Sequence, residues 1–553
     1  MVKSHLLILS LLFILGACAS RLANQMKAYR EAYQSGDYDK AEKLLEKSAL
    51  KKKTNSKLLW HLEKGTVSLA KGDENDAIAN FQTSLDLIDQ LYTTKLGSKA
   101  ASLFVNDASD EFYGASYERS YAHYFLTKAY YARYLKSDNK LDLQGARGTI
   151  LAWDSYFTQL QRSASAKTLY HTDLMLKVFG GVVHEISEVK NDKQIALQLY
   201  KDALKILDQE GGIFSLFNSK HVDYVKAYET SIKTQQAPPA NLYQKTNAYQ
   251  DLKDFLHYKM LSLTKDVRGS EFQNLSKTLA ASKSVLKKIA DGPTNVVVVL
   301  EEGLIPSKVG KPFNFGLRGA AKSVKNPAAS AFIATVGTEV VTAFAMNKLG
   351  MAPTQTTGPG SFLFAHSVTR LAVQEAAVEF ELPMIEEVPV VQRLELFVLS
   401  EEGVIVDHHP LPVVSENGDI ARVVLEEDVV SKYVKTGTRV AVRHLVAIVG
   451  AMQVYNGIAR SNAGGFIAQT AAMGTYVAAA KGIASLEKAD TRHWRTLPQA
   501  LRMSEFKLAP GKYQVAVAAY SGEKVPESPS KILGNIEVKS KNKSLHHLKM
   551  ISP

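Results

Sequence analysis

Apolar residues recur at helical spacing from residue 24 to about residue 285, in a stretch that is nearly free of proline. Beyond residue 290 the spacing changes to short runs of β-branched residues that are separated by glycine and proline. The first pattern predicts helices and the second predicts strands. We therefore expect an α+β multidomain chain, with an all-helical domain at residues 18–288 and a mixed, β-rich domain at residues 289–553.

Two stretches of the first half resemble the turn between the helices of a tetratricopeptide repeat, in which glycine closes the turn. They begin at Gly36 and Gly72, and 72 − 36 = 36 residues is close to the usual period of about 34. Weaker copies begin at Asp138 and Asn191. Because each hairpin buries its apolar face only against its neighbours, such a stack is expected to leave a concave surface that holds a partner segment.

The second half is expected to form a β-sandwich-like module with inserted helices rich in alanine and glycine. Strands are predicted at residues 296–300, 388–391, 394–399, 404–406, 421–425, 510–517 and 535–538. The inserted helices are predicted at about 321–381 and 429–488, with one helical stretch at residues 362–380. Their glycines would also suit helix packing in a bilayer, as in an export pore, but Glu339, Arg443 and Gln469 make insertion unfavourable.

The chain opens with Lys3 and an apolar run that ends in Leu15-Gly16-Ala17-Cys18, the layout of a secretory signal. These four residues resemble the lipobox of bacterial lipoproteins, which implies cleavage after residue 17 and lipidation of Cys18, the only cysteine of the chain. Because no aspartate follows Cys18, the resemblance implies transfer to the outer membrane, most simply facing the periplasm. The lipid would attach the protein to the membrane without a spanning helix.

The formal charge of +12 becomes 12 − 1 = +11 when Lys3 is removed with the signal, and this excess indicates either acidic neighbours or a diffuse, solvated charge without a partner. Nucleic acid is excluded by the expected compartment, so the candidate neighbours are anionic lipid headgroups, lipopolysaccharide phosphates and acidic envelope proteins. Lys51, Lys52 and Lys53 form a basic patch near the lipid in sequence. This patch either contacts anionic headgroups or forms a solvated face.

Four tyrosines, Tyr113, Tyr117, Tyr121 and Tyr124, follow one another at steps of four, four and three residues. This spacing places them on one face of a helix. They either line the binding groove or fill the core of the repeat, and aromatic stripes at helical spacing are usually packing.

Three segments, at residues 112–119, 297–306 and 489–498, together resemble a family of proteobacterial lipoproteins with a tetratricopeptide-like front half. The resemblance implies an envelope location and no established activity. Some relatives are encoded beside small lipoproteins that resemble activators of peptidoglycan synthases. In the third segment, Arg492 and Trp494 are candidates for a docking surface, or for a structural clamp between the preceding helix and the following strands.

No cofactor or metal site is predicted, because adjacent residues on a strand, such as His408 and His409, point to opposite faces. Acid pairs such as Glu301-Glu302 stand beside turns or strand ends and leave an envelope hydrolase as the alternative function. The leading hypothesis is not an enzyme. It is an envelope scaffold that binds other envelope proteins through its helical repeats, in peptidoglycan or outer-membrane assembly, with an export complex as a further alternative.

Overall fold

The computed structural model describes most of the helical half and most of the predicted strands of the chain. The described residues are 22, 24–95, 110–162, 170, 172–187, 189–208, 247–316, 377–386, 392–427, 488–520, 524–539, 542–550 and scattered positions between 436 and 483. Cys18 and most of the two predicted inserted segments lie outside this part of the chain. The fold is a mixture of helices and sheets, as the α+β prediction requires.

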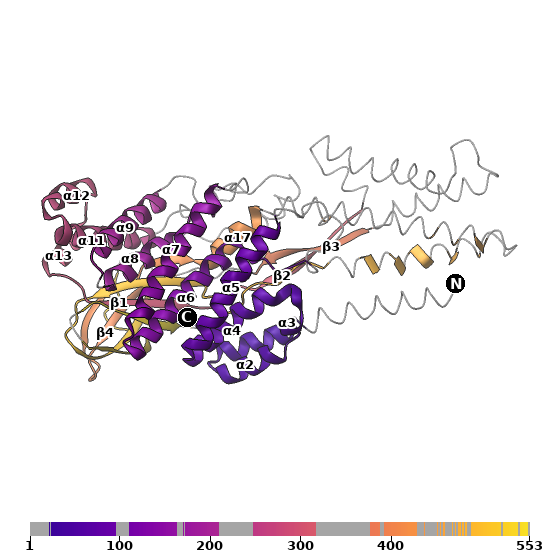
Figure 1. Cartoon of the computed structure of the whole chain (residues 1–553), viewed down its shortest axis with the longest axis horizontal. Helices are drawn as coiled ribbons and strands as arrows, with labels where there is room; N and C mark the ends of the chain where they lie inside the picture. Colours follow the sequence, from indigo (N-terminus) through magenta and orange to yellow (C-terminus); the bar gives the residue numbers. More distant parts are fainter. Residues whose placement is uncertain are drawn as a thin grey trace.

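The described residues of the first half consist mainly of helices (Figure 1). They are a helix at residues 24–34, α2 (Tyr38–Lys47), α3 (Ala49–Lys52), α4 (Lys57–Lys71), α5 (Glu74–Lys95), α6 (Ser116–Ser137), α7 (Lys140–Arg162), α8 (Leu174–Ile186), α9 (Asp192–Asp208), α11 (Asn247–Val267), α12 (Phe272–Thr278) and α13 (Lys283–Ala290). Helices α4 and α5, α6 and α7, and α8 and α9 pack as hairpins.

All four predicted turns lie between helices, and each contains a residue in the left-handed region. These residues are Gly36 (φ 80°), Gly72 (φ 80°), Asp138 (φ 53°) and Asn191 (φ 78°). An aspartate or asparagine follows each of them. The side chains of Asp37 and Asp73 accept backbone N–H groups of the next helix and so cap its first turn.

Within the described ranges, ten strands form two four-stranded sheets and one two-stranded ribbon. They are β1 (Val296–Glu302), β2 (Lys308–Gly316), β3 (Ala377–Ile385), β4 (Arg393–Leu399), β5 (Ile405–Pro410), β6 (Val413–Glu416), β7 (Ala500–Phe506), β8 (Gly511–Tyr520), β9 (Lys531–Val538) and β10 (Ser544–Met550). The first sheet has the order β10-β1-β7-β6, and the second has the order β5-β4-β8-β9. Strands β2 and β3 pair antiparallel as the ribbon.

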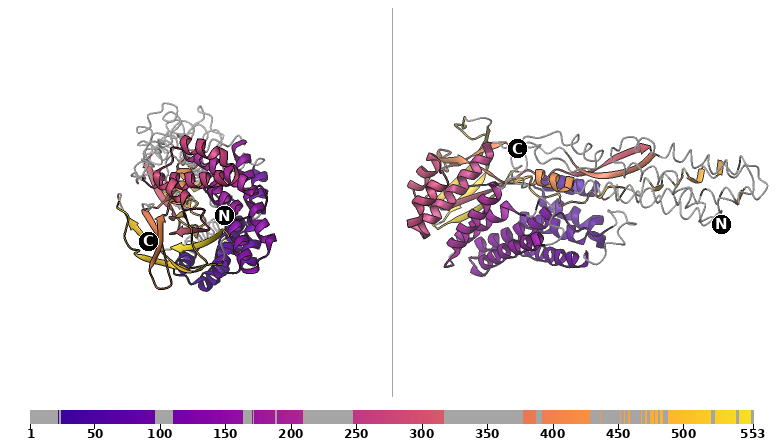
Figure 2. Two further views of the ribbon diagram at one scale, coloured as in Figure 1. Left: turned by 90° about the vertical axis from the view of Figure 1, so that its left-hand side faces the viewer. Right: turned by 90° about the horizontal axis from the view of Figure 1, so that it is seen from above.

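Strand β1 is buried on both faces, which explains its unbroken apolar sequence. Val297 and Val299 belong to the hydrophobic core that the helices build. Val296, Val298 and Leu300, on the opposite face, share a second core with strands β4, β8 and β9. The first sheet therefore lies between the helical layer and the second sheet, and the helices curve around the strands in the left view of Figure 2.

Two sequence predictions were wrong. Residues 421–425 form part of helix α17 (Asn417–Glu427) and not a strand, because Ile420, Ala421 and Val424 pack on the helical core at helical spacing. The helix predicted at residues 362–380 overlaps strand β3, which begins at Ala377 and pairs with β2. Strands β2, β6, β7 and β10 were not predicted, whereas residues 388–391 lie outside the described part.

In the part of the chain that the structure describes, no helix combines the length and the apolar character that crossing a membrane requires.

Candidate functional site

The segment at residues 489–498, which leads into β7, packs against the inner side of the helical layer. We call it the clamp segment. The side chain of Trp494 is fully buried, with its ring 6.1 Å from that of Phe81 and 5.2 Å from that of Phe125. Its indole N–H donates to the hydroxyls of Thr66 (3.0 Å) and Thr496 (3.2 Å). Trp494 thereby joins the β-rich half to helices α4, α5 and α6.

A buried carboxylate of α4, Glu63, holds the next two residues of the clamp segment. Its Oε1 accepts the backbone N–H of Arg495 at 2.7 Å. Its Oε2 accepts the hydroxyls of Thr496 (2.6 Å) and Tyr29 (3.0 Å). Burial raises the pKa of Glu63 to about 7, although these hydrogen bonds favour the charged form.

A second buried carboxylate, Glu118 of α6, holds the backbone at Trp494. One of its oxygens accepts the backbone N–H of Ala115 (2.6 Å) and so caps its own helix. The other accepts the backbone N–H of Trp494, also at 2.6 Å. Burial raises the pKa of Glu118, against the effect of these two donors. Glu63 and Glu118 together accept the backbone N–H groups of two successive residues, at the start of the turn that begins at Arg495.

The guanidinium of Arg492 fixes the start of the clamp segment. It is held by Asp490 through two hydrogen bonds of 2.9 Å. It also donates to the backbone carbonyls of Asn55 and Asp110, both at 2.9 Å, and to the hydroxyl of Ser56 at 3.3 Å. Arg492 therefore connects the clamp segment to the residues that precede α4 and α6.

Farther along the helical layer, Glu301 of β1 points into the helices. It accepts the hydroxyl of Tyr124 at 3.0 Å and forms an ion pair with Lys128. Burial alone would raise the pKa of Glu301, but Lys128 and Lys549 outweigh it and lower this pKa to about 2. Lys549 in turn donates to the hydroxyl of Tyr33. Strands β1 and β10 are thus tied to two helices, α6 and the helix at residues 24–34, by charged and polar contacts.

A buried cluster of four charges joins α8 and α11 to β7 and to Lys543, the residue before β10. Lys259 lies 2.5 Å from Glu185 and 3.0 Å from Glu505, and Lys543 contacts the same two carboxylates. Burial would raise the pKa of Glu505, but the two lysines hold it well below its usual range. The charges balance, so the cluster stabilises this contact without leaving an unpaired buried ion.

The structure places most of the predicted tyrosine stripe inside the protein. Tyr113 precedes helix α6, which begins at Ser116, so the helical stripe comprises only the other three tyrosines. Tyr117 is 4% exposed, and Tyr121 and Tyr124 are fully buried. These rings fill the interface between the helices and the sheets, as the packing interpretation holds, and they do not line an open groove.

The predicted lysine patch divides into two parts. Lys51 forms an ion pair with Glu46 and lies 5.3 Å above the ring of Trp60. Lys52 and Lys53 are exposed.

The histidines of β5 point to opposite faces of the strand, as expected. His408 lies 2.7 Å from Glu395 and stacks on Phe397, whereas His409 stacks on Phe506 of the other sheet. Within the described ranges, no group of three or more His, Cys, Asp or Glu side chains is arranged to hold a metal ion.

The acids of the Glu301-Glu302 pair also diverge. Glu301 faces the helical layer and contacts Lys128, while Glu302 forms an ion pair of 2.6 Å with Arg502 of β7. Each carboxylate is therefore engaged by a separate cation on a separate face of the strand. The two do not face each other across a substrate-sized gap, as the pair of acids in a glycosidase does.

The clamp carboxylates were missed by sequence reasoning, although a signal for them exists. Glu63 stands four residues after Leu59 and four before Val67, in the buried stripe of α4. Glu118 is also a buried residue of its helix, α6, where it follows Tyr117 directly and lies three residues before Tyr121. A carboxylate inside an apolar stripe needs a buried donor, and such positions indicate contacts with a distant part of the chain.

Searches of family models, curated proteins and solved structures found no match to this chain.

Proposed function

We propose that the chain is a scaffold of the cell envelope, anchored through a lipid on Cys18 to the outer membrane and facing the periplasm. In this proposal its tetratricopeptide-like hairpins bind other envelope proteins, in peptidoglycan or outer-membrane assembly, and a β-sandwich-like half stiffens them. The observation that carries the proposal is the pair of hydrogen bonds by which the carboxylates of Glu63 and Glu118 accept the backbone N–H groups of residues 495 and 494. Helical repeats typically bind partners on their concave surface. In this proposal the inner side of the helical layer is occupied by residues 494 and 495 of the same chain, and partners bind the outer side.

The outer face of α7 is the partner surface that we favour. Leu141 is 68% exposed and Leu151 is 58% exposed. Gln144, Gly148 and Ala152 are exposed with them, at helical spacing and without charge. An uncharged strip with two large apolar side chains is suited to packing against another protein.

Photo-crosslinking from position 144 in the native host tests this proposal. We expect one discrete protein partner, which is lost in the variant L141D/L151D. The matched control is V404D, because Val404 is 64% exposed and lies next to β5 on the other side of the protein. Recovery of no discrete partner, or equal loss in both variants, would refute the proposal.

A further inference from the structure

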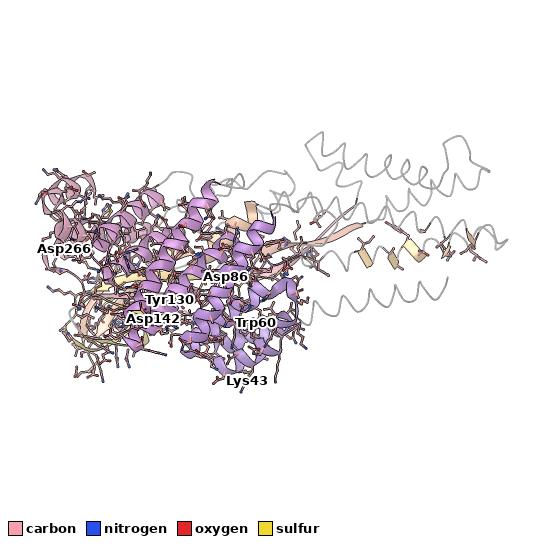
Figure 3. All side chains as sticks on the ribbon, in the orientation of Figure 1. Lys43, Trp60, Asp86, Tyr130, Asp142 and Asp266 are labelled. Atoms are coloured by element: carbon pink, nitrogen blue, oxygen red, sulfur yellow. The ribbon has the colours of Figure 1, made fainter. Side chains whose placement is uncertain are left out.

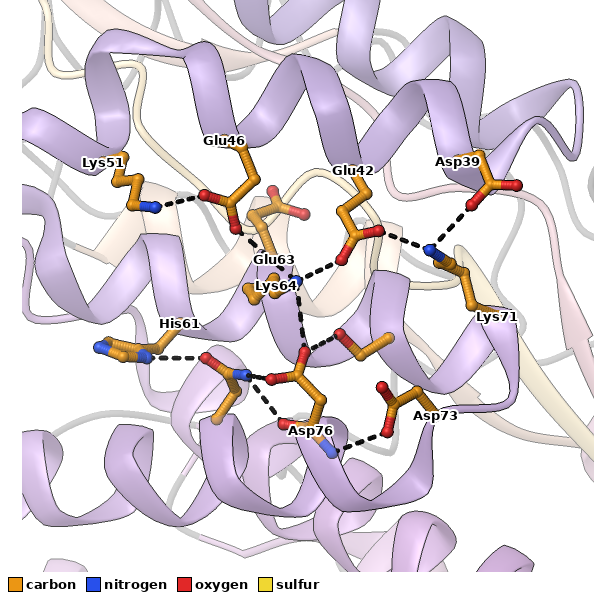
Figure 4. A network of polar contacts seen from close by, with 12 residues as sticks. Asp39, Glu42, Glu46, Lys51, His61, Glu63, Lys64, Lys71, Asp73 and Asp76 are labelled. Carbon is orange, nitrogen blue, oxygen red and sulfur yellow. Dashed lines mark hydrogen bonds and ion pairs between the residues drawn. The ribbon is translucent and has the colours of Figure 1, made fainter.

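The acidic side chains of helix α2 form ion pairs with lysines of α4, whereas its own lysines point elsewhere. The acids Asp39, Glu42 and Glu46 lie on the side that faces α4 (Figure 4). Lys71 of α4 lies 2.8 Å from Asp39 and 2.5 Å from Glu42. Lys64 contacts Glu42 and lies 3.7 Å from Glu46. The three acids of this helix are therefore paired with lysines of α4, although Asp39 itself is exposed.

The lysines of α2 and of the residues after it remain exposed. Between residues 40 and 57 the chain has seven lysines and two glutamates, a net charge of 7 − 2 = +5. Six of these lysines form no ion pair with any described residue. They are Lys40, Lys43, Lys47, Lys52, Lys53 and Lys57, which we call the lysine surface. Lys43 lies at the lower edge of the protein in Figure 3.

We propose that the lysine surface lies on the anionic phospholipid headgroups of the membrane to which the lipid anchors the protein. This inference rests on the lipid anchor of the proposed function. Lys40 follows Cys18 by 40 − 18 = 22 residues, so the anchor and the surface are close in sequence. Each lysine near an anionic bilayer strengthens binding about fivefold, and several together orient the protein. Charge complementarity favours this partner, because residues 37–57 carry seven lysines and four acids, a net charge of 7 − 4 = +3, and three of these acids are paired with lysines.

Binding of the lipid-free mature chain, carrying Cys18→Ser, to vesicles tests the proposal. The vesicles contain phosphatidylglycerol mixed with phosphatidylcholine, or phosphatidylcholine alone. The test variant is K43Q/K47Q/K52Q in the lysine surface. The control variant is K277Q/K283Q/K287Q in α12 and α13, which lowers the net charge by the same amount. The second set is exposed and lies at the opposite end of the protein, near Asp266 in Figure 3.

The first variant is expected to bind anionic vesicles about 100-fold more weakly than the parent chain, whereas the control is expected to change by less than about threefold. Neither should bind phosphatidylcholine alone. Equal losses in both variants, or binding of the parent to neutral vesicles, would overturn the proposal. If the first variant keeps vesicle binding but loses the crosslinked partner, the surface binds an acidic protein instead. Failure to find a partner at α7 leaves the vesicle result unchanged, so the two proposals fail separately.

Discussion

Replacing Trp494 by alanine is expected to destabilise the whole described fold. The ring is fully buried between Phe81 and Phe125, and its N–H donates hydrogen bonds to the hydroxyls of Thr66 and Thr496. Loss of a buried tryptophan costs about 4 kcal/mol, from lost burial and from the cavity that remains. Trp494→Phe keeps most of the ring but leaves Thr66 without its indole donor, so a loss of about 2 kcal/mol is expected.

Urea unfolding measured by far-ultraviolet circular dichroism and by tryptophan fluorescence gives this free energy. Trp60→Ala is the matched control, because Trp60 lies on the same helix as Thr66 but is only half-buried, and we expect a loss of about 1 kcal/mol. A loss below about 1 kcal/mol for Trp494→Ala would refute the reasoning. Such a result would mean that this side chain does not join the two halves.

Three further variants test other parts of the structure. Burial raises the pKa of Glu63 to about 7 in the folded protein, so the protonated side chain stabilises the fold fully below pH 4.5 and this stabilisation is lost as the pH rises through 7. In Glu63→Gln, the free energy of unfolding by urea should therefore decline less between pH 4.5 and pH 7. Glu301→Gln should cost about 3 kcal/mol by thermal unfolding, because Lys128 loses its buried counter-charge. Gly65→Ala should cost about 2 kcal/mol, because its Cβ would lie 2.8 Å from an aromatic ring, whereas Gly148→Ala, with open space, should be neutral or slightly stabilising.

Each of these expectations has a result that contradicts it. An equal pH dependence of the parent chain and Glu63→Gln would mean that Glu63 is not the titrating group. A Glu301→Gln variant as stable as the parent would mean that the ion pair of Glu301 with Lys128 does not stabilise the interface. Equal effects of alanine at positions 65 and 148 would contradict the close approach of α4 and α5.

Features determined by neighbouring residues could be predicted from the sequence. The turns at Gly36 and Gly72 require a left-handed residue followed by a cap, and both requirements are met by adjacent residues. The weaker turns at Asp138 and Asn191 were also found, because the helical spacing on either side limits where a turn can lie. Likewise, the short apolar runs of β1 and β4, bounded by turn residues, marked them as strands.

Features that depend on distant residues could not be predicted. Trp494 and Arg492 were identified as candidates, but their partners on α4 and α6, or just before these helices, lie about 380 to 440 residues earlier in the chain. Nothing near Glu63 in sequence specifies that it accepts the backbone of residue 495. For the same reason strand β10, which has a polar sequence, was missed, since only its pairing with β1 makes it a strand.

Native-state hydrogen exchange tests the central claim most directly, namely that the clamp segment joins the helical layer and the sheets into one cooperative unit. We predict that the amides of α4, α6, β1 and β7 share one opening free energy, and that Trp494→Ala lowers it equally in all four elements. Protection in α4 and α6 that persists while β7 exchanges, or that is unchanged in Trp494→Ala, would contradict this claim.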